Sequence, residues 1–194
     1  MAVEIVSYGG WARNARISDG QVEAIVTLEV GPRILRYGFV GEPNVLGELP
    51  AQLGGRGEDK WMMRGGHRLW ISPESGDRSY ERDNDPVYWE EIDGGVRVWQ
   101  APGPKTGIVK TMEIRMRAGG HLSVRHIMEN QSGAPFELSV WALTVVPAHG
   151  MAIIPLPEKI PLGKSFLPNQ HWSIWTYTDL SDTRARFGAR YVLL

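Results

Sequence analysis

Residues 107–130, GIVKTMEIRMRAGGHLSVRHIMEN, contain two strand-like runs on either side of a Gly-Gly turn. In the first run Met112 and Ile114 alternate with charged side chains, and in the second run Leu122 and Val124 keep the same two-residue period. Such alternation is typical of strands with one buried and one polar face. The stretch therefore predicts an antiparallel pair of strands in a half-buried sheet.

The same pattern recurs along the chain, at residues 22–30, 33–41, 96–101 and 136–146. Turn residues, mostly Gly with Pro, Asp or Ser, separate these runs, and no helical periodicity persists for three turns. We expect an all-β, antiparallel fold, either a sandwich or a barrel. The least regular region, about 41–90, would then form long connections on a rigid sheet, where binding sites usually lie.

Composition excludes several classes of function. The 194 residues contain 21 Lys and Arg against 22 Asp and Glu, with no basic block, so nucleic acid is not an expected partner. The absence of cysteine excludes disulfides, thiolate metal sites and a cysteine nucleophile. The eight tryptophans suit either a large core or the stacking of flat sugar faces.

The two ends of the sequence give different signals. MAVEIVSYGG lacks the basic and apolar regions of a secretory signal, and no run approaches the roughly 18 apolar residues of a membrane span, which predicts a cytoplasmic protein without a membrane partner. The apolar run Tyr191–Leu194 predicts a strand whose neighbour lies beyond the sequence, as in a shortened version of a longer protein. An open sheet edge of that kind would favour a homodimer.

The stretch RGGHRLWISPE, residues 64–74, combines a turn, a strand and several polar side chains. Gly65 and Gly66 predict a tight turn that feeds the Leu-Trp-Ile strand into a core. The remaining polar residues of the stretch, Arg64, His67, Arg68 and Glu74, would surround one pocket.

Several motifs, taken in order, carry a resemblance to a known family. They are EVGPRILRYGFVGEPNVLGE (29–48), RGGHRLWISPE, Tyr80 with DNDPV (83–87), HLSVRHIMENQSGAPFELSVWALTVV (121–146) and GMAIIPLP (150–157). Together they resemble the galactose mutarotase-like superfamily, which includes the aldose 1-epimerases, and within it an uncharacterised bacterial branch. The resemblance covers roughly residues 20–160. It implies an antiparallel β-supersandwich over residues 1–194, incomplete at its C-terminal end, with a sugar held on the concave face of one sheet.

The chemistry of that family is proton exchange at the anomeric centre, with a histidine as acid and a carboxylate as base. His67 follows the glycines at a position that the epimerases usually fill with another residue; a histidine there could act as the acid, and a structural histidine bonded to the backbone is the alternative. The family's acid histidine would fall at about Trp141 to Leu143, where this chain has none, and the family's late glutamate has no counterpart before Leu194. Both departures bear on whether the chain catalyses the exchange.

The expected ligand-binding residues are Arg64, Arg68, Glu74, Trp70, Asp83, Asp85 and Trp141. The simpler alternatives are that Arg64 is a surface arginine and that Arg68 and Glu74 form a salt bridge. The two aspartates would then lie in a solvated Asp-Asn-Asp-Pro turn, and the two tryptophans in a core. No metal or other cofactor is expected, because His121 and His126 should face opposite sides of their strand and the Asp-rich turn lacks the pattern of a calcium loop.

Three functions therefore remain open from the sequence. The first is an aldose epimerase-like enzyme that interconverts the anomers of a small-molecule carbohydrate. The second is a carbohydrate-binding module without catalysis, and the third is a structural β-domain. The missing strand histidine favours the second over the first, and the polar residues of RGGHRLWISPE argue against the third.

Overall fold

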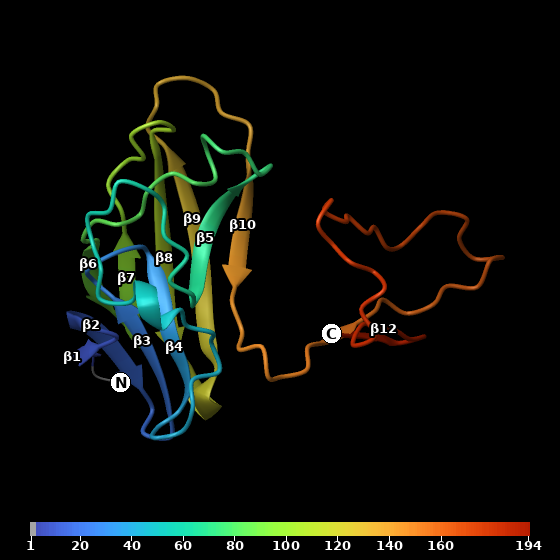
Figure 1. The fold of residues 1–194 in the computed structure, drawn as a ribbon, viewed down its shortest axis with the longest axis horizontal. Helices are drawn as coiled ribbons and strands as arrows, with labels where there is room; N and C mark the ends of the chain where they lie inside the picture. Colours follow the sequence, from blue (N-terminus) through green and yellow to red (C-terminus); the bar gives the residue numbers. More distant parts are fainter. Residues whose placement is uncertain (1–2) are drawn as a thin grey trace. The chain divides into compact units, whose positions relative to one another are not determined.

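A computed structural model describes residues 3–194, which form two compact parts, Met1–Ala148 and His149–Leu194 (Figure 1). All strand pairs in both parts are antiparallel, so the all-β, antiparallel fold expected from the sequence is confirmed. No helix among residues 3–194 has the length and hydropathy needed to cross a membrane.

The first part contains a six-stranded sheet in the order β1-β2-β3-β4-β5-β10. Consecutive strands pair as hairpins up to β4, whereas β10 joins the edge of the sheet beside β5 from far along the chain. The bounds are β1 Val3–Tyr8, β2 Trp11–Ser18, β3 Val22–Thr27, β4 Arg33–Phe39, β5 His67–Ser72 and β10 Ser139–Thr144.

A four-stranded meander, β6-β7-β8-β9, forms the second sheet. Its bounds are β6 Tyr88–Ile92, β7 Gly95–Trp99, β8 Ile108–Met116 and β9 Leu122–Asn130. The predicted Gly-Gly turn between β8 and β9 is the short 3₁₀ segment Ala118–Gly120, where both glycines have positive φ. That conformation favours glycine, because a side chain there is strained.

The core lies between the two sheets and follows the alternation seen in the sequence. Ile17, Val26 and Leu69 from the six-stranded sheet share one buried cluster with Met112 and Ile114 from the four-stranded sheet. Because the cluster draws on the facing sides of both sheets, this part is a β-sandwich.

The other face of the six-stranded sheet is covered by the long connection between β4 and β5, which includes the 3₁₀ turn Pro50–Gln52. A second buried cluster, made by Trp11, Val30 and Leu35 with Leu53 packed on it, lies on this side. The sheet is thus buried on both faces near β4 and β5, which explains why β4 is buried along most of its length.

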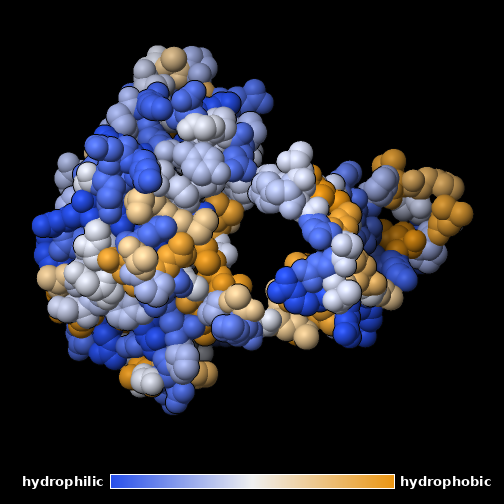
Figure 2. Space-filling view, in the orientation of Figure 1, coloured by the Kyte–Doolittle hydropathy of each residue, from blue (hydrophilic) through white to orange (hydrophobic). Residues whose placement is uncertain are grey.

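The second part, His149–Leu194, has little regular structure. β13 (Tyr191–Leu193) lies between β11 (Ile153–Pro155) and β12 (Arg186–Phe187), so the strand expected at the C-terminal end exists and is bonded on both sides. Large apolar side chains are exposed on this part, as Figure 2 shows; among them are Leu162, Phe166 and Tyr177.

Candidate functional site

Successive side chains of β5 point to opposite faces of the sheet, so the residues of RGGHRLWISPE in this strand are divided between two faces. Leu69 belongs to the core between the sheets, so His67, two residues earlier, points to the same side. Arg68 and Trp70 therefore lie on the opposite face, under the connection from β4 to β5. The sequence grouped these side chains around one pocket, whereas the strand separates them into two candidate sites.

Four aromatic rings gather around Arg68 on the outer face of β5. Trp70 lies 5.0 Å from Trp61, 4.8 Å from Tyr80 and 5.7 Å from Trp141, measured between ring centroids at steep angles. The β5–β10 register places Trp70 directly opposite Trp141. We call these rings and Arg68 the arginine-aromatic cluster.

The guanidinium of Arg68 lies between two of these rings. Its central carbon is 5.2 Å from the ring centroid of Trp61 and 4.7 Å from that of Trp70, within the range of cation–π attraction. Arg68 is only 5 % exposed, and its buried Nε and Nη1 have no hydrogen-bond partner among residues 3–194. Burial, followed by the charge of Arg33, lowers the pKa of Arg68 to about 10. Ring faces stabilise the cation but leave its in-plane donors unsatisfied.

Arg33 stands directly opposite Arg68 in the β4–β5 ladder. Its Nη2 donates to Asp83 Oδ2 at 2.9 Å, and its Nη1 donates to the carbonyl oxygens of Met63 and Gly65, both at 2.7 Å. Asp83 was expected from the sequence to contact a ligand, and here it neutralises one arginine of a cross-strand pair. The buried Oδ1 of Asp83 accepts no hydrogen bond from the residues that the structure describes.

A cavity of about 530 Å³ adjoins the arginine-aromatic cluster. Trp61 and Tyr80, which contact each other at 5.3 Å, line it, and Tyr80 is 41 % exposed. Acidic and basic side chains also line the cavity; they are Asp59, Lys60, Glu81, Arg82 and Lys105. Aromatic walls with a charged rim and this volume fit a small polar molecule that also has flat apolar faces.

His67 faces the space between the sheets, where it meets a second histidine. Its Nε2 is 2.8 Å from Nε2 of His126 on β9, and its Nδ1 is 2.8 Å from Oγ1 of Thr144 on β10. Burial, then the charges of His126 and Arg68, lowers the pKa of His67 to about 4, and burial lowers that of His126. Both rings are therefore neutral at pH 7, a form that can accept a proton, whereas a general acid near neutrality needs a pKa close to that pH.

Arg64 occupies a different place from the one the resemblance implies. Its side chain is fully buried, with Nη2 2.6 Å from Glu58 and 3.1 Å from Asn84, and with Nη1 donating to the carbonyl of Gln52 at 2.7 Å. The guanidinium also lies over the ring of Trp11. These contacts anchor the β4–β5 connection, and ligand binding by Arg64 stays a prediction.

Glu74 and Asp85 lie outside the arginine-aromatic cluster. Glu74 accepts a hydrogen bond from the hydroxyl of Tyr80 at 2.6 Å, which ties the end of the motif to the cavity wall, whereas Asp85 is exposed. No group of three or more potential ligands for a metal ion occurs among residues 3–194.

Three residues of the two sites were not singled out from the sequence. They are Trp61, Arg33 and, as a partner of His67, His126. Trp61 lies only three residues before Arg64, and the concentration of tryptophan around the motif was a usable signal. The pairings of Arg33 with Arg68 and of His126 with His67 depend on how distant strands align, which the sequence of one strand does not predict.

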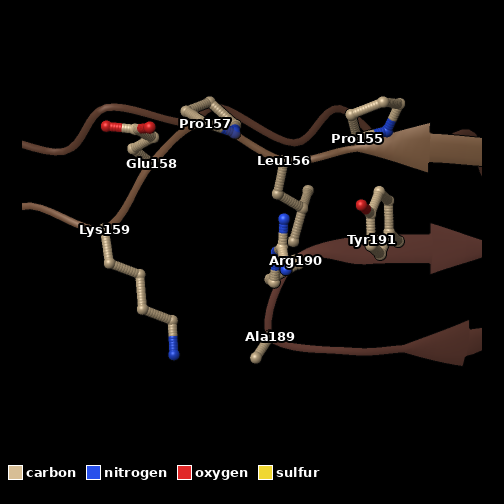
Figure 3. A pocket seen from close by; sticks show the side chains of 8 residues that line it. All are labelled: Pro155, Leu156, Pro157, Glu158, Lys159, Ala189, Arg190 and Tyr191. Carbon is tan, nitrogen blue, oxygen red and sulfur yellow. The ribbon is translucent and has the colours of Figure 1, made fainter.

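The second part of the chain holds a cavity of about 570 Å³ (Figure 3). It is a hollow beside the short strands β11 and β13, and Pro155, Leu156, Lys159, Arg190 and Tyr191 are among its lining residues. Most of these residues are exposed. It contains no buried polar group and none of the residues expected to bind a ligand, so we assign the candidate site to the cavity at Trp61 and Tyr80.

Comparisons of the chain with protein-family models, with curated proteins and with solved structures find no match.

Proposed function

We propose that the chain binds a small carbohydrate in the cavity lined by Trp61 and Tyr80. The observation that carries the proposal is the arginine-aromatic cluster, in which ring faces and a buried cation lie next to a sugar-sized cavity. Aromatic rings suit the apolar faces of a sugar, while charged and amide groups suit its hydroxyls. The resemblance to the galactose mutarotase-like superfamily supports the same class of ligand.

Interconversion of sugar anomers is the second candidate function. The contact between His67 and His126 favours it, because two neutral imidazoles in contact can pass one proton. His67 lies on the opposite face of β5 from the cavity, however, so the geometry supports binding better than catalysis.

The test of binding is a titration with a panel of aldoses, in which tryptophan fluorescence and calorimetry measure the affinity. We expect Trp61→Ala to lower affinity at least tenfold, because the ring forms a wall of the cavity. Trp99→Ala is the matched control, since Trp99 stacks on Tyr88 beside a separate cavity of the four-stranded sheet. No binding of any aldose, or loss of binding in the Trp99 variant alone, would overturn the proposal.

The catalytic alternative is tested by NMR exchange between α and β anomers of glucose and galactose. If the enzyme reading is correct, the wild type exceeds the spontaneous rate and His67→Gln does not. Binding without acceleration would leave the carbohydrate-binding module as the function.

A further inference from the structure

Two cations of the first part are buried without an anionic partner. Arg68 is 5 % exposed and Lys110 is 3 % exposed, and neither forms a salt bridge or side-chain hydrogen bond with any of residues 3–194. The other three buried arginines among these residues are paired: Arg33 with Asp83, Arg36 with Glu23 and Arg64 with Glu58. A buried cation is costly unless it is paired, so Arg68 and Lys110 need an explanation.

The charges around these two residues do not balance. Arg68 and Lys110 both lie within electrostatic range of Arg33 and Asp83, and Lys110 also of Glu81. Three cations thus share two carboxylates, which leaves a surplus of one positive charge. Burial lowers the pKa of both Lys110 and Arg68, as expected for cations that lack compensation.

Neither carboxylate forms an ion pair with Arg68, although the charge of Asp83 attracts it from a distance. Asp83 is bonded to Arg33, and the Glu81 carboxylate accepts hydrogen bonds from the backbone N–H groups of Lys105 and Thr106 and from the Thr106 hydroxyl. The cross-strand position of Arg33 opposite Arg68 adds repulsion between like charges. A bound ligand that carries one negative charge would neutralise the surplus positive charge and reduce the repulsion between Arg33 and Arg68.

We propose that the arginine-aromatic cluster is a subsite for the carboxylate of an acidic sugar such as a hexuronate. This inference rests on the proposed function and narrows it from sugars in general to sugars that carry one anionic group. The sugar ring occupies the cavity at Trp61 and Tyr80, and its carboxylate reaches the guanidinium of Arg68. A singly charged carboxylate matches the surplus of one positive charge, whereas a phosphate monoester carries nearly two charges at pH 7.

Access to Arg68 requires the ring of Trp61 to move, because Nε and Nη1 of Arg68 are covered. The indole N–H of Trp61 has no hydrogen-bond partner in the described part of the chain, so no such bond from these residues holds the ring in place. Trp61 belongs to both the cavity wall and the cluster. Its fluorescence therefore reports the arrival of the carboxylate.

The experiment compares the affinities of glucuronate and galacturonate with those of glucose and galactose. We expect the uronates to bind at least tenfold more tightly in low salt, with the preference falling as salt rises. Arg68→Met should abolish the preference while neutral sugars still bind. Arg97→Met is the matched control, because Arg97 also lies over a tryptophan, Trp99, but is paired with Glu90 on the surface.

Each outcome is decisive for one claim. Equal affinity of the wild type for uronates and neutral sugars overturns the carboxylate subsite and leaves the proposed function standing, whereas no binding of any sugar overturns the proposed function. Tighter binding of glucose 6-phosphate than of glucuronate assigns the cluster to a phosphate and overturns the carboxylate. If Arg68→Met does not fold, Arg68→Gln replaces it; an unchanged uronate preference without the cation also overturns the proposal.

Discussion

His67 of β5 and His126 of β9 meet across the two sheets of the sandwich with their Nε2 atoms 2.8 Å apart. At this distance one nitrogen donates a proton and the other accepts it, so the pair holds one shared proton in its stable form. An added proton would charge one ring and turn the acceptor nitrogen into a donor, so that two N–H groups would face each other at the edge of the core. The pair therefore couples the packing of the sheets to pH.

Acidification should destabilise the first part through this pair. The pKa of His67 is about 4 in the folded chain and about 6.5 in an unfolded one, so between these values the unfolded chain binds more protons and stability falls as pH falls. Because the ring is partly exposed, we expect a loss of only about 1–2 kcal/mol between pH 7 and pH 4. Urea unfolding across this range measures it. His67→Gln should flatten the pH dependence, and His121→Gln, at an exposed position, should leave it as in the wild type.

The turn before β5 should tolerate no side chain. Gly66 has a φ of +71°, and an added Cβ would overlap the carbonyl oxygen of Ile34 in the neighbouring strand. We expect Gly66→Ala to cost more than about 3 kcal/mol, since it combines backbone strain with a clash in a buried ladder. Gly76→Ala is the control, because nothing lies within 4 Å of its added Cβ. Thermal unfolding measures both, and similar midpoints for the two variants would contradict the prediction.

Removal of Arg64 should reduce stability. Arg64→Met breaks the ion pair with Glu58 and the bonds to Asn84 and Gln52 at a fully buried site, and we expect a loss of about 3 kcal/mol. Arg97→Met removes another Arg–Glu pair, but its two partners are 43 % and 50 % exposed, so its loss should cost less than about 1 kcal/mol. Chemical denaturation gives both values. Wild-type stability in the Arg64 variant would refute the anchoring role.

The Glu81 carboxylate should hold the loop at residues 103–107 beside the cavity. It accepts hydrogen bonds from the N–H groups of Lys105 and Thr106 and from the Thr106 hydroxyl at 2.7 to 3.1 Å. Glu81→Gln weakens these charge-assisted bonds, and we expect local protection to fall by about 1–2 kcal/mol. Hydrogen exchange of the 103–107 amides measures the change; unaltered exchange there would show that other contacts hold the loop.

Sequence reasoning succeeded where structure follows from local alternation. The strands at 107–130, their Gly-Gly turn and the strand after Gly66 were predicted because each pattern lies within a few residues. β2 was missed because Asn14 and Arg16 interrupt its apolar pattern. Asn14 is buried all the same, since its amide donates to the carbonyls of Val6 and Trp11 at the bulge between β1 and β2.

The candidate site was predicted only in part, because it is built by contacts between distant segments. The sequence named Arg68, Trp70 and Trp141 as ligand-binding residues, which stays a prediction, and the structure brings these three together. The sequence also predicted His67 in the same pocket, because the order of polar residues does not show which face of a strand each one occupies. That division appears only once β5 is set between β4 and β10.

The division has a consequence for how this segment can change in evolution. Gly65 and Gly66 fix the phase in which the chain enters β5, and a strand has a period of two. Inserting or deleting one residue there would exchange the surroundings of His67 and Arg68, placing a guanidinium in the apolar core and an imidazole among the tryptophans. Substitution can tune either face separately, but a change of length at this turn alters both at once.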